Sequence, residues 1–308
     1  MSPTGSATTV MGGPGDDQAA ILADRLGRRY GDVTAVESVS FSIHPGEFFA
    51  LLGPNGAGKT TTLHMLTTMV RPTSGTASVF GFDVVREAHA VRRLLGMVFQ
   101  DPALDDRLTA RENLEIHAVL YGIGRKERAG VIERALDWAA LTEARDRRVR
   151  SFSGGMKRRL ELARALTHSP KVLFLDEPTI GLDPQGRRNL WEHIAALREG
   201  GMTVLMTTHN LPEAEACDRV AIMDAGRLVA VGTPPELVAR FAGGHSDQPP
   251  TAALAGRAAS GMEAAEPAKP ADLEDVFIAL TGKQLRDEQA TARDRLVSFA
   301  KRGGEHTR

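Results

Sequence analysis

Residues 48–60 read Phe-Phe-Ala-Leu-Leu-Gly-Pro-Asn-Gly-Ala-Gly-Lys-Thr, and they give the clearest indication of the fold. Its first five residues form a continuous apolar run, which is typical of a strand buried on both faces. Residues 53–60 then match the Gly-x-x-x-x-Gly-Lys-Thr phosphate-binding pattern, and a helical pattern follows to about Met69. A buried strand, this loop and a helix in that order predict an α/β core that binds nucleotide.

The chemistry of this phosphate loop is the capture of a polyphosphate. Gly56 and Gly58 allow the backbone to bend so that several N–H groups face one anion, and the helix N-terminus adds partial positive charge. Lys59 reaches the outer phosphates, and the Thr60 hydroxyl binds Mg²⁺. The alternative is a glycine-rich turn with a chance lysine, which the strand before and the helix after disfavour. The residues expected to bind nucleotide here are Gly53, Pro54, Asn55, Gly56, Ala57, Gly58, Lys59, Thr60 and Thr61.

A second motif lies at residues 172–177, Val-Leu-Phe-Leu-Asp-Glu, where an apolar strand ends in two carboxylates. A nucleotide site needs one carboxylate to hold Mg²⁺ through water and another to polarise the attacking water. Asp176 would take the first role and Glu177 the second. Taken alone, this pattern is equally well explained by a strand followed by an acidic turn, and the phosphate loop favours the nucleotide site.

A third motif is Ser153-Gly154-Gly155, which precedes a basic helical run. The hydroxyl group and the bare N–H groups could bind phosphate at a helix start. Taken alone, an ordinary helix cap is the simpler explanation.

Composition excludes several classes of protein. Of 308 residues, 42% are hydrophobic and 25% are charged, as in an ordinary globular protein. Lys+Arg and Asp+Glu number 38 and 39, so the net charge of −1 argues against a protein that coats nucleic acid. With Cys217 as the one cysteine, no internal disulfide can form, which fits a reducing compartment. We find no apolar run of about 18 residues that would span a bilayer and no secretory signal at the N-terminus.

The pattern along the chain predicts four regions. They are a disordered N-terminal arm (1–20), a nucleotide-binding domain (21–240), a flexible linker (241–271) and a short helical C-terminal segment (272–308). The domain carries a mainly helical subdomain at about 102–166, and the C-terminal segment carries a helix at 272–280. Further strands are predicted at 35–43, 172–175, 203–206, 220–223 and 228–231.

The three motifs, together with His209, occur in the order and spacing of ABC-type ATP-binding subunits, which residues 22–239 resemble. Four stretches are similar to the daunorubicin-resistance type, the ATPase half of two-protein drug exporters. They are 99–106 (Phe-Gln-Asp-Pro-Ala-Leu-Asp-Asp), 153–160 (Ser-Gly-Gly-Met-Lys-Arg-Arg-Leu), 177–184 (Glu-Pro-Thr-Ile-Gly-Leu-Asp-Pro) and 273–282 (Leu-Glu-Asp-Val-Phe-Ile-Ala-Leu-Thr-Gly).

The resemblance implies roles for further residues. Tyr30 would stack on adenine, against the alternative of a strand-end tyrosine. Gln100 would touch Mg²⁺ and the attacking water and sense a membrane subunit. Asp183 would cross to the opposite subunit's site. His209 would contact the γ-phosphate, although a lone histidine after a strand is usually structural. The implied catalytic residues are therefore Glu177, His209 and Gln100, and the implied metal ligands are Thr60, Gln100 and Asp176.

The implied fold is a P-loop NTPase (RecA-like) α/β core with an antiparallel β portion and an inserted α-helical subdomain. The implied activity is ATP hydrolysis with Mg²⁺ by a homodimer that shares two sites and binds no nucleic acid. A separate integral-membrane permease would hold the dimer at the cytoplasmic face of the cell membrane and export a hydrophobic drug or secondary metabolite. The alternatives are the ATPase of a polysaccharide or lipid exporter, and a soluble non-transport ABC ATPase.

Overall fold

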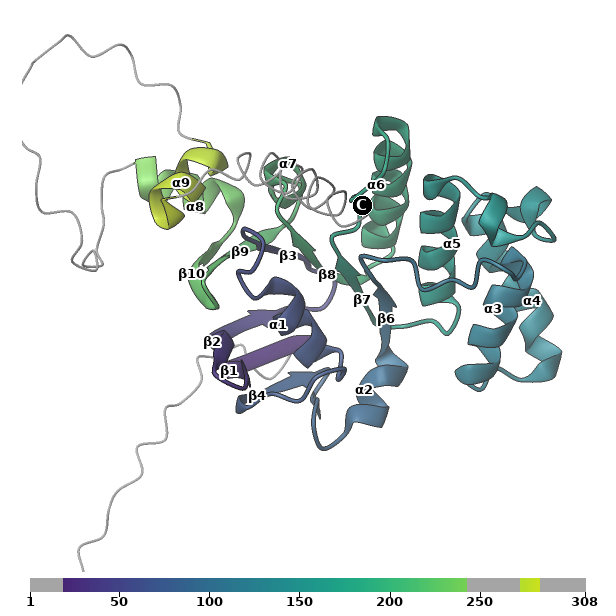
Figure 1. Ribbon diagram of the computed structural model, residues 1–308, viewed down its shortest axis with the longest axis horizontal. Helices are drawn as coiled ribbons and strands as arrows, with labels where there is room; N and C mark the ends of the chain where they lie inside the picture. Colours follow the sequence, from purple (N-terminus) through teal and green to yellow (C-terminus); the bar gives the residue numbers. More distant parts are fainter. Residues whose placement is uncertain (1–18, 243–271, 283–308) are drawn as a thin grey trace, which may run out of the picture.

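The computed structural model describes residues 19–242 and 272–282 and centres on a ten-stranded sheet (Figure 1). The strands are β1 (Ile21–Tyr30), β2 (Val33–Ile43), β3 (Phe48–Leu52), β4 (Ser74–Val79), β5 (Phe82–Asp83), β6 (Leu95–Val98), β7 (Val172–Asp176), β8 (Thr203–Thr208), β9 (Arg219–Asp224) and β10 (Arg227–Gly232). Their order in the sheet is β5-β4-β1-β2-β10-β9-β3-β8-β7-β6.

Five adjacent strands, from β9 through β3, β8 and β7 to β6, pair in parallel and form the core. Every residue of β3, β7 and β8 is buried, because helices cover both faces of a parallel sheet. Phe49 and Phe174 belong to the core on one face, and Leu52 and Leu175 to the core on the other. The predicted strands at 48–52, 172–175 and 203–206 are confirmed, and with them the α/β class.

One antiparallel part consists of β1, β2, β4 and β5, and β10 joins it to the core by pairing in parallel with β2 and antiparallel with β9. The sequence pattern predicted β2 but not β1, because the pairing register of β1 shifts between Ala23 and Leu26 and again near Arg28. Arg25 lies inside this irregularity with φ +47, so apolar and polar residues do not alternate along the strand. Strands β4 and β5 were also not predicted, since the first half of β4 consists of exposed serine, glycine and threonine and β5 is only two residues long.

Nine α-helices are described, in addition to two short 3₁₀ helices at Thr142–Ala144 and Val149–Ser151. The α-helices are α1 (Lys59–Leu66), α2 (Ala88–Leu94), α3 (Ala110–Leu120), α4 (Arg125–Trp138), α5 (Gly154–Leu166), α6 (Pro184–Glu199), α7 (Leu211–Glu215), α8 (Pro234–Ala242) and α9 (Leu273–Thr281). Helices α3, α4 and α5 lie between β6 and β7 in the chain and stand at one end of the molecule (Figure 1). They share a small core of their own that includes Leu114, Leu136, Phe152 and Leu160. This arrangement is the predicted helical insertion.

The C-terminal helix α9 docks on the same chain. Asp272 caps its N-terminus, and Leu273, Val276 and Phe277 are buried in the core that α7 and α8 also cover. The predicted helix at 272–280 is therefore present. None of the helices in the described part of the chain has the length and apolar character needed to cross a membrane.

The folded region extends slightly beyond the predicted domain boundaries. Ala20 is buried and its N–H donates to Ile43 O, so the core begins before residue 21. At the other end, α8 continues to Ala242. Residues 1–18 of the predicted arm, residues 243–271 of the predicted linker (241–271) and residues 283–308 lie outside the described residues.

Candidate functional site

The site forms where three neighbouring parallel strands end. Strand β8 lies between β3 and β7, and the last residue of β3, Leu52, pairs with Thr208 while Asp176 pairs with Thr207. Since parallel strands present their carboxyl ends at one edge of the sheet, the segments that follow all three strands meet there. Those segments contain the phosphate loop, the Asp176–Glu177 pair and His209, which are far apart in the sequence.

Two glycines of the phosphate loop are required by the backbone geometry. A Cβ at Gly53 would lie 2.3 Å from Met223 O, so the loop packs directly on β9. Gly58 has φ +99, and a Cβ there would lie 2.7 Å from Ala35 O. Helix α1 then begins at Lys59, and Gly58 offers no side chain to cap its first-turn N–H groups. An uncapped helix start beside a glycine loop is a site that favours an anion.

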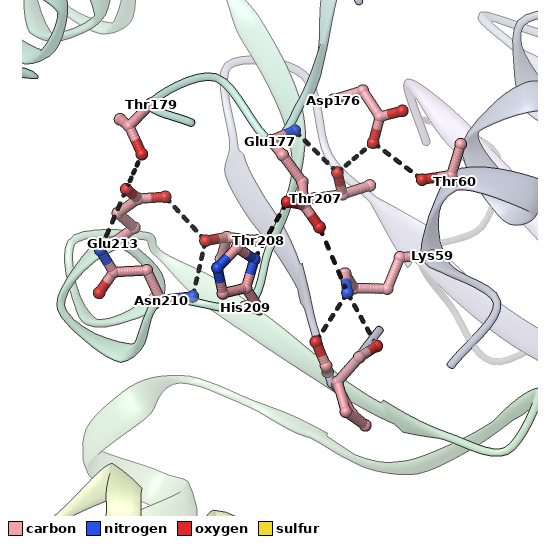
Figure 2. A network of polar contacts seen from close by, with 12 residues as sticks. Lys59, Thr60, Asp176, Glu177, Thr179, Thr207, Thr208, His209, Asn210 and Glu213 are labelled. Carbon is pink, nitrogen blue, oxygen red and sulfur yellow. Dashed lines mark hydrogen bonds and ion pairs between the residues drawn. The ribbon is translucent and has the colours of Figure 1, made fainter. Parts of the chain in front are cut away.

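Lys59 is buried and folds back over its own loop. Its ammonium donates to Gly53 O at 2.7 Å and to Pro54 O at 3.0 Å, and it lies 3.6 Å from Glu177 Oε1 (Figure 2). The contact with Glu177 links the loop after β3 to the end of β7. It also places the one full positive charge of the phosphate loop next to the carboxylate predicted to act on water.

Asp176 and Thr60 form an oxygen-rich cluster on the other side of the site. The hydroxyl groups of Thr60 and Thr207 donate to the same carboxylate oxygen of Asp176, at 3.1 and 2.5 Å (Figure 2). Carboxylate and hydroxyl oxygens are the hard ligands that Mg²⁺ selects. The donor set of Thr60 and Asp176 therefore fits this ion.

Glu177 lies between two basic groups. Its Oε2 is 3.0 Å from His209 Nδ1, and its backbone N–H donates to the hydroxyl group of Thr207 at 3.0 Å. Burial alone would raise the pKa of Glu177, but the hydrogen bond and charge of His209 and the charge of Lys59 outweigh burial and lower it. The same hydrogen bond raises the pKa of His209 against the effect of burial. Glu177 is therefore an ionised carboxylate that can orient water or accept a proton.

Glu213 is a part of this network that the sequence did not predict. This buried carboxylate on α7 accepts hydrogen bonds from Thr179 Oγ1, from Thr208 Oγ1 at 2.7 Å and from Asn210 Nδ2 at 3.3 Å (Figure 2). Because Thr208 and Asn210 flank His209, Glu213 holds that histidine's backbone in place. A cavity of 140 Å³ lies beside Thr179, His209 and Glu213. In the sequence, a glutamate in the first turn of a helix simply resembles a solvated residue.

Two of the predicted parts of the site, the helix starts at Ser153 and at Asp183, lie apart from this network. Ser153 caps α5, accepting a hydrogen bond from Met156 N at 3.3 Å, and Asp183 caps α6, accepting from Gly186 N at 2.7 Å. The two helix starts are neighbours, since a Cβ at Gly155 would lie 3.8 Å from Gly186 Cα. Among the described residues, no hydrogen bond or ion pair links Ser153, Gly154 or Gly155 to the phosphate loop.

Tyr30 and Gln100 are exposed. Tyr30 ends β1 with 43% of its surface accessible, and the Arg28 guanidinium lies 4.4 Å from its ring centroid. Gln100 follows β6, which pairs in parallel with β7, so its segment reaches the same edge of the sheet as Glu177.

Comparison with known proteins shows that the chain is similar to ATP-binding proteins of ABC transporters. The sequence profile of the family described as "ABC transporter" matches residues 36–180. The daunorubicin resistance ATP-binding protein DrrA3 of Streptomyces coeruleorubidus is 44% identical over 229 residues, covering 74% of this chain and 72% of that protein. The Nod factor export ATP-binding protein I of Paraburkholderia xenovorans (strain LB400) is 39% identical over 302 residues, covering 88% and 99%.

Solved structures show the same fold. CbiO1 of Clostridium perfringens, part of the ABC transporter complex cbiONQ, matches with a TM-score of 0.66 at 28% identity, covering 73% of this chain and 92% of that one. The ATP-binding cassette MJ0796, solved as a dimer in a post-hydrolysis state with ADP and Pi, matches with a TM-score of 0.63 at 27% identity, covering 69% and 98%.

Proposed function

The chain belongs to the ABC transporter ATP-binding family, and we propose that it is the ATPase of a two-component exporter of a hydrophobic drug or secondary metabolite. One observation carries the enzymatic part: Lys59, Asp176, Glu177 and His209 come from three separate strand ends and meet at one edge of the sheet.

The geometry supports a division of roles among these residues. Lys59 and the N–H groups at the start of α1 would bind the outer phosphates, and Thr60 and Asp176 would hold Mg²⁺. When bound, Mg²⁺ supplies positive charge to the phosphate oxygens. Glu177 would orient the attacking water and accept its proton. His209 stabilises the ionised form of Glu177, which it contacts at 3.0 Å, and would face the γ-phosphate.

We further propose that two copies of the chain share their sites. Ser153, Gly155 and Asp183 are exposed or half-buried near the starts of α5 and α6, and the described contacts of Ser153 and Asp183 do not involve their own phosphate loop. They would complete the ATP site of the second copy. The N-terminus of α5 would then supply further N–H groups to the γ-phosphate.

A permease would dock on the helical subdomain and hold the dimer at the cytoplasmic face of the cell membrane. Support comes from α3, where Ile116, Val119 and Leu120 expose between 50% and 77% of their surface. Exposed apolar patches of this kind mark protein contacts. The Nod factor relatives favour a second candidate cargo, a Nod-factor-like molecule, because one of them aligns with 88% of this chain.

The test of the enzymatic part is Lys59→Ala against a matched control, Lys126→Ala, which changes an exposed lysine on α4. We expect Mg²⁺-dependent ATP hydrolysis by the wild type and the control, and loss of both ATP binding and turnover in Lys59→Ala. Near-normal ATP affinity in Lys59→Ala would contradict the phosphate-loop assignment. For the cargo, coexpression with a candidate permease and a panel of hydrophobic antibiotics should give resistance that Lys59→Ala abolishes.

A further inference from the structure

Helix α5 contains a buried ion pair that the roles above do not use. Arg158 Nη1 lies 3.1 Å from Glu161 Oε2, one turn along the helix, and the two residues are 6% and 0% exposed. Removing two charges from water is costly, and an ion pair alone rarely repays that cost. The remaining hydrogen bonds of the pair therefore indicate what it does.

The guanidinium of Arg158 holds the backbone on both sides of Glu177. Its Nε donates to Pro178 O at 2.8 Å and its Nη2 donates to Asp176 O at 3.4 Å. Glu177, between these two carbonyl groups, has φ +44, in the left-handed region that non-glycine residues rarely adopt. Such a conformation persists where surrounding contacts over-determine it. Arg158 supplies those contacts from one side, and Thr207 supplies them from the other through Glu177 N.

The same pair holds both ends of the segment that contains Gln100. Arg158 Nη1 donates to Phe99 O at 2.5 Å, and Glu161 Oε1 accepts from Ala103 N at 2.8 Å. The exposed Gln100 therefore lies in a short loop whose two ends are tied to one helix.

We propose that Arg158 and Glu161 are positioning residues. They hold Glu177 and Gln100 at fixed positions relative to helix α5, so that these two groups act on one ATP. The inference rests on the proposed function. Because Ser153–Gly155 open α5, a movement of the helical subdomain against the sheet would be transmitted through this pair to Glu177. The geometry needs arginine, since its planar guanidinium group reaches carbonyl groups on two segments at once, whereas a lysine is a single point donor.

The decisive variant is Arg158→Lys, which keeps the positive charge beside Glu161 but lacks the planar guanidinium group with its several N–H donors. We expect kcat to fall roughly 10- to 100-fold, as a small displacement of catalytic groups produces. We expect KM for ATP and the affinity for ATP to stay near those of the wild type, because none of the described contacts of Arg158 is with the phosphate loop.

The matched control is Arg159→Lys. Arg159 is the next residue of α5 and donates from Nε to Ala139 O at 2.9 Å, within the helical subdomain. The same substitution there should leave kcat unchanged. A second readout is gel filtration with Mg-ATP. If Arg158 acts through Glu177, Arg158→Lys should accumulate as an ATP-bound dimer because hydrolysis is slow while binding is intact.

Several outcomes would overturn the inference. One is wild-type turnover in Arg158→Lys; another is a parallel loss of kcat, ATP affinity and melting temperature, which would indicate a general structural role. If Arg158→Lys does not fold, Glu161→Gln replaces it, since the amide oxygen can still accept from Ala103 N. A several-fold fall in kcat at constant KM would then support the role, and an unchanged kcat would refute it. A failure of the proposed function can be told apart from a failure of this inference, because the wild type itself would then show no ATP hydrolysis.

Discussion

Replacing Glu177 by glutamine tests the site most directly, because it removes one charge and almost no volume. The amide cannot accept a proton from water, and loss of a general base typically slows a reaction about 10²- to 10⁴-fold. We expect kcat to fall by that factor. Glutamine has nearly the same size and shape as glutamate and can still form hydrogen bonds, so we expect the fold to be unchanged.

The effect on ATP binding follows from the contact between Glu177 and Lys59. Their charged atoms lie 3.6 Å apart, and unit charges at about 4 Å interact by roughly 4 kcal/mol at an effective dielectric constant near 20. A terminal phosphate must replace Glu177 as the partner of Lys59, so the carboxylate competes with ATP. Removing it should leave ATP affinity unchanged or raise it by up to about tenfold, which corresponds to roughly 1.4 kcal/mol.

The variant should also change the titration of His209. The hydrogen bond to Glu177 is the largest cause of its raised pKa, so an NMR titration of Glu177→Gln should show that pKa returning toward the ordinary value of 6.5. The matched control is Glu192→Gln, at an exposed position on α6. Steady-state hydrolysis, isothermal titration with ATP and gel filtration should together show slow turnover, tight binding and an ATP-held dimer. A Glu177→Gln protein that hydrolyses ATP at the wild-type rate would refute the assignment of the base.

Three other expectations concern the dimer, the C-terminal helix and pH. Ser153→Ala combined with Gly155→Asp should bind ATP but not hydrolyse it, and mixing it with Lys59→Ala should restore part of the activity through one intact shared site; hydrolysis by the double variant alone would disprove sharing. Phe277→Ala should lower the free energy of unfolding by roughly 3–5 kcal/mol in chemical denaturation, since Phe277 is fully buried, and an unchanged midpoint would show that α9 does not stabilise the core. Burial, followed by nearby positive charge, lowers the pKa of His117 from 6.5 to about 3, so below pH 6.5 the unfolded chain binds a proton that the folded chain excludes. The free energy of unfolding should therefore decrease as the pH falls below 6.5, and at pH 5 it should be about 2 kcal/mol lower than above pH 6.5. His117→Gln should remove that part of the pH dependence in denaturation curves.

The parts of the fold that were predicted have strong local patterns. The buried run at β3 and the loop after it are contiguous, so one window of sequence contains the strand, the turn chemistry and the helix start. The helix at α9 was predicted because Asp272, four apolar residues at helical spacing and Gly282 lie within a few residues of one another. By contrast, β1 was not predicted, because its bulge at Arg25 interrupts the alternation that marks a strand.

The residues of the candidate site fall into the same two groups: those that the sequence identifies and those that only the tertiary structure identifies. Lys59, Asp176 and Glu177 could be named from the sequence because each lies in a short motif whose chemistry can be inferred from the motif itself. His209 lies in no such motif and was named only from the resemblance to ABC-type subunits. That these four residues meet, and that Glu177 has both Lys59 and His209 as partners, was decided only by the order β3-β8-β7 in the sheet. Glu213, Arg158 and Glu161 lie in helices and resemble ordinary charged residues in the sequence. Their roles come from burial and from hydrogen bonds to distant backbone, which only the tertiary structure can create because it brings together segments that no local pattern connects.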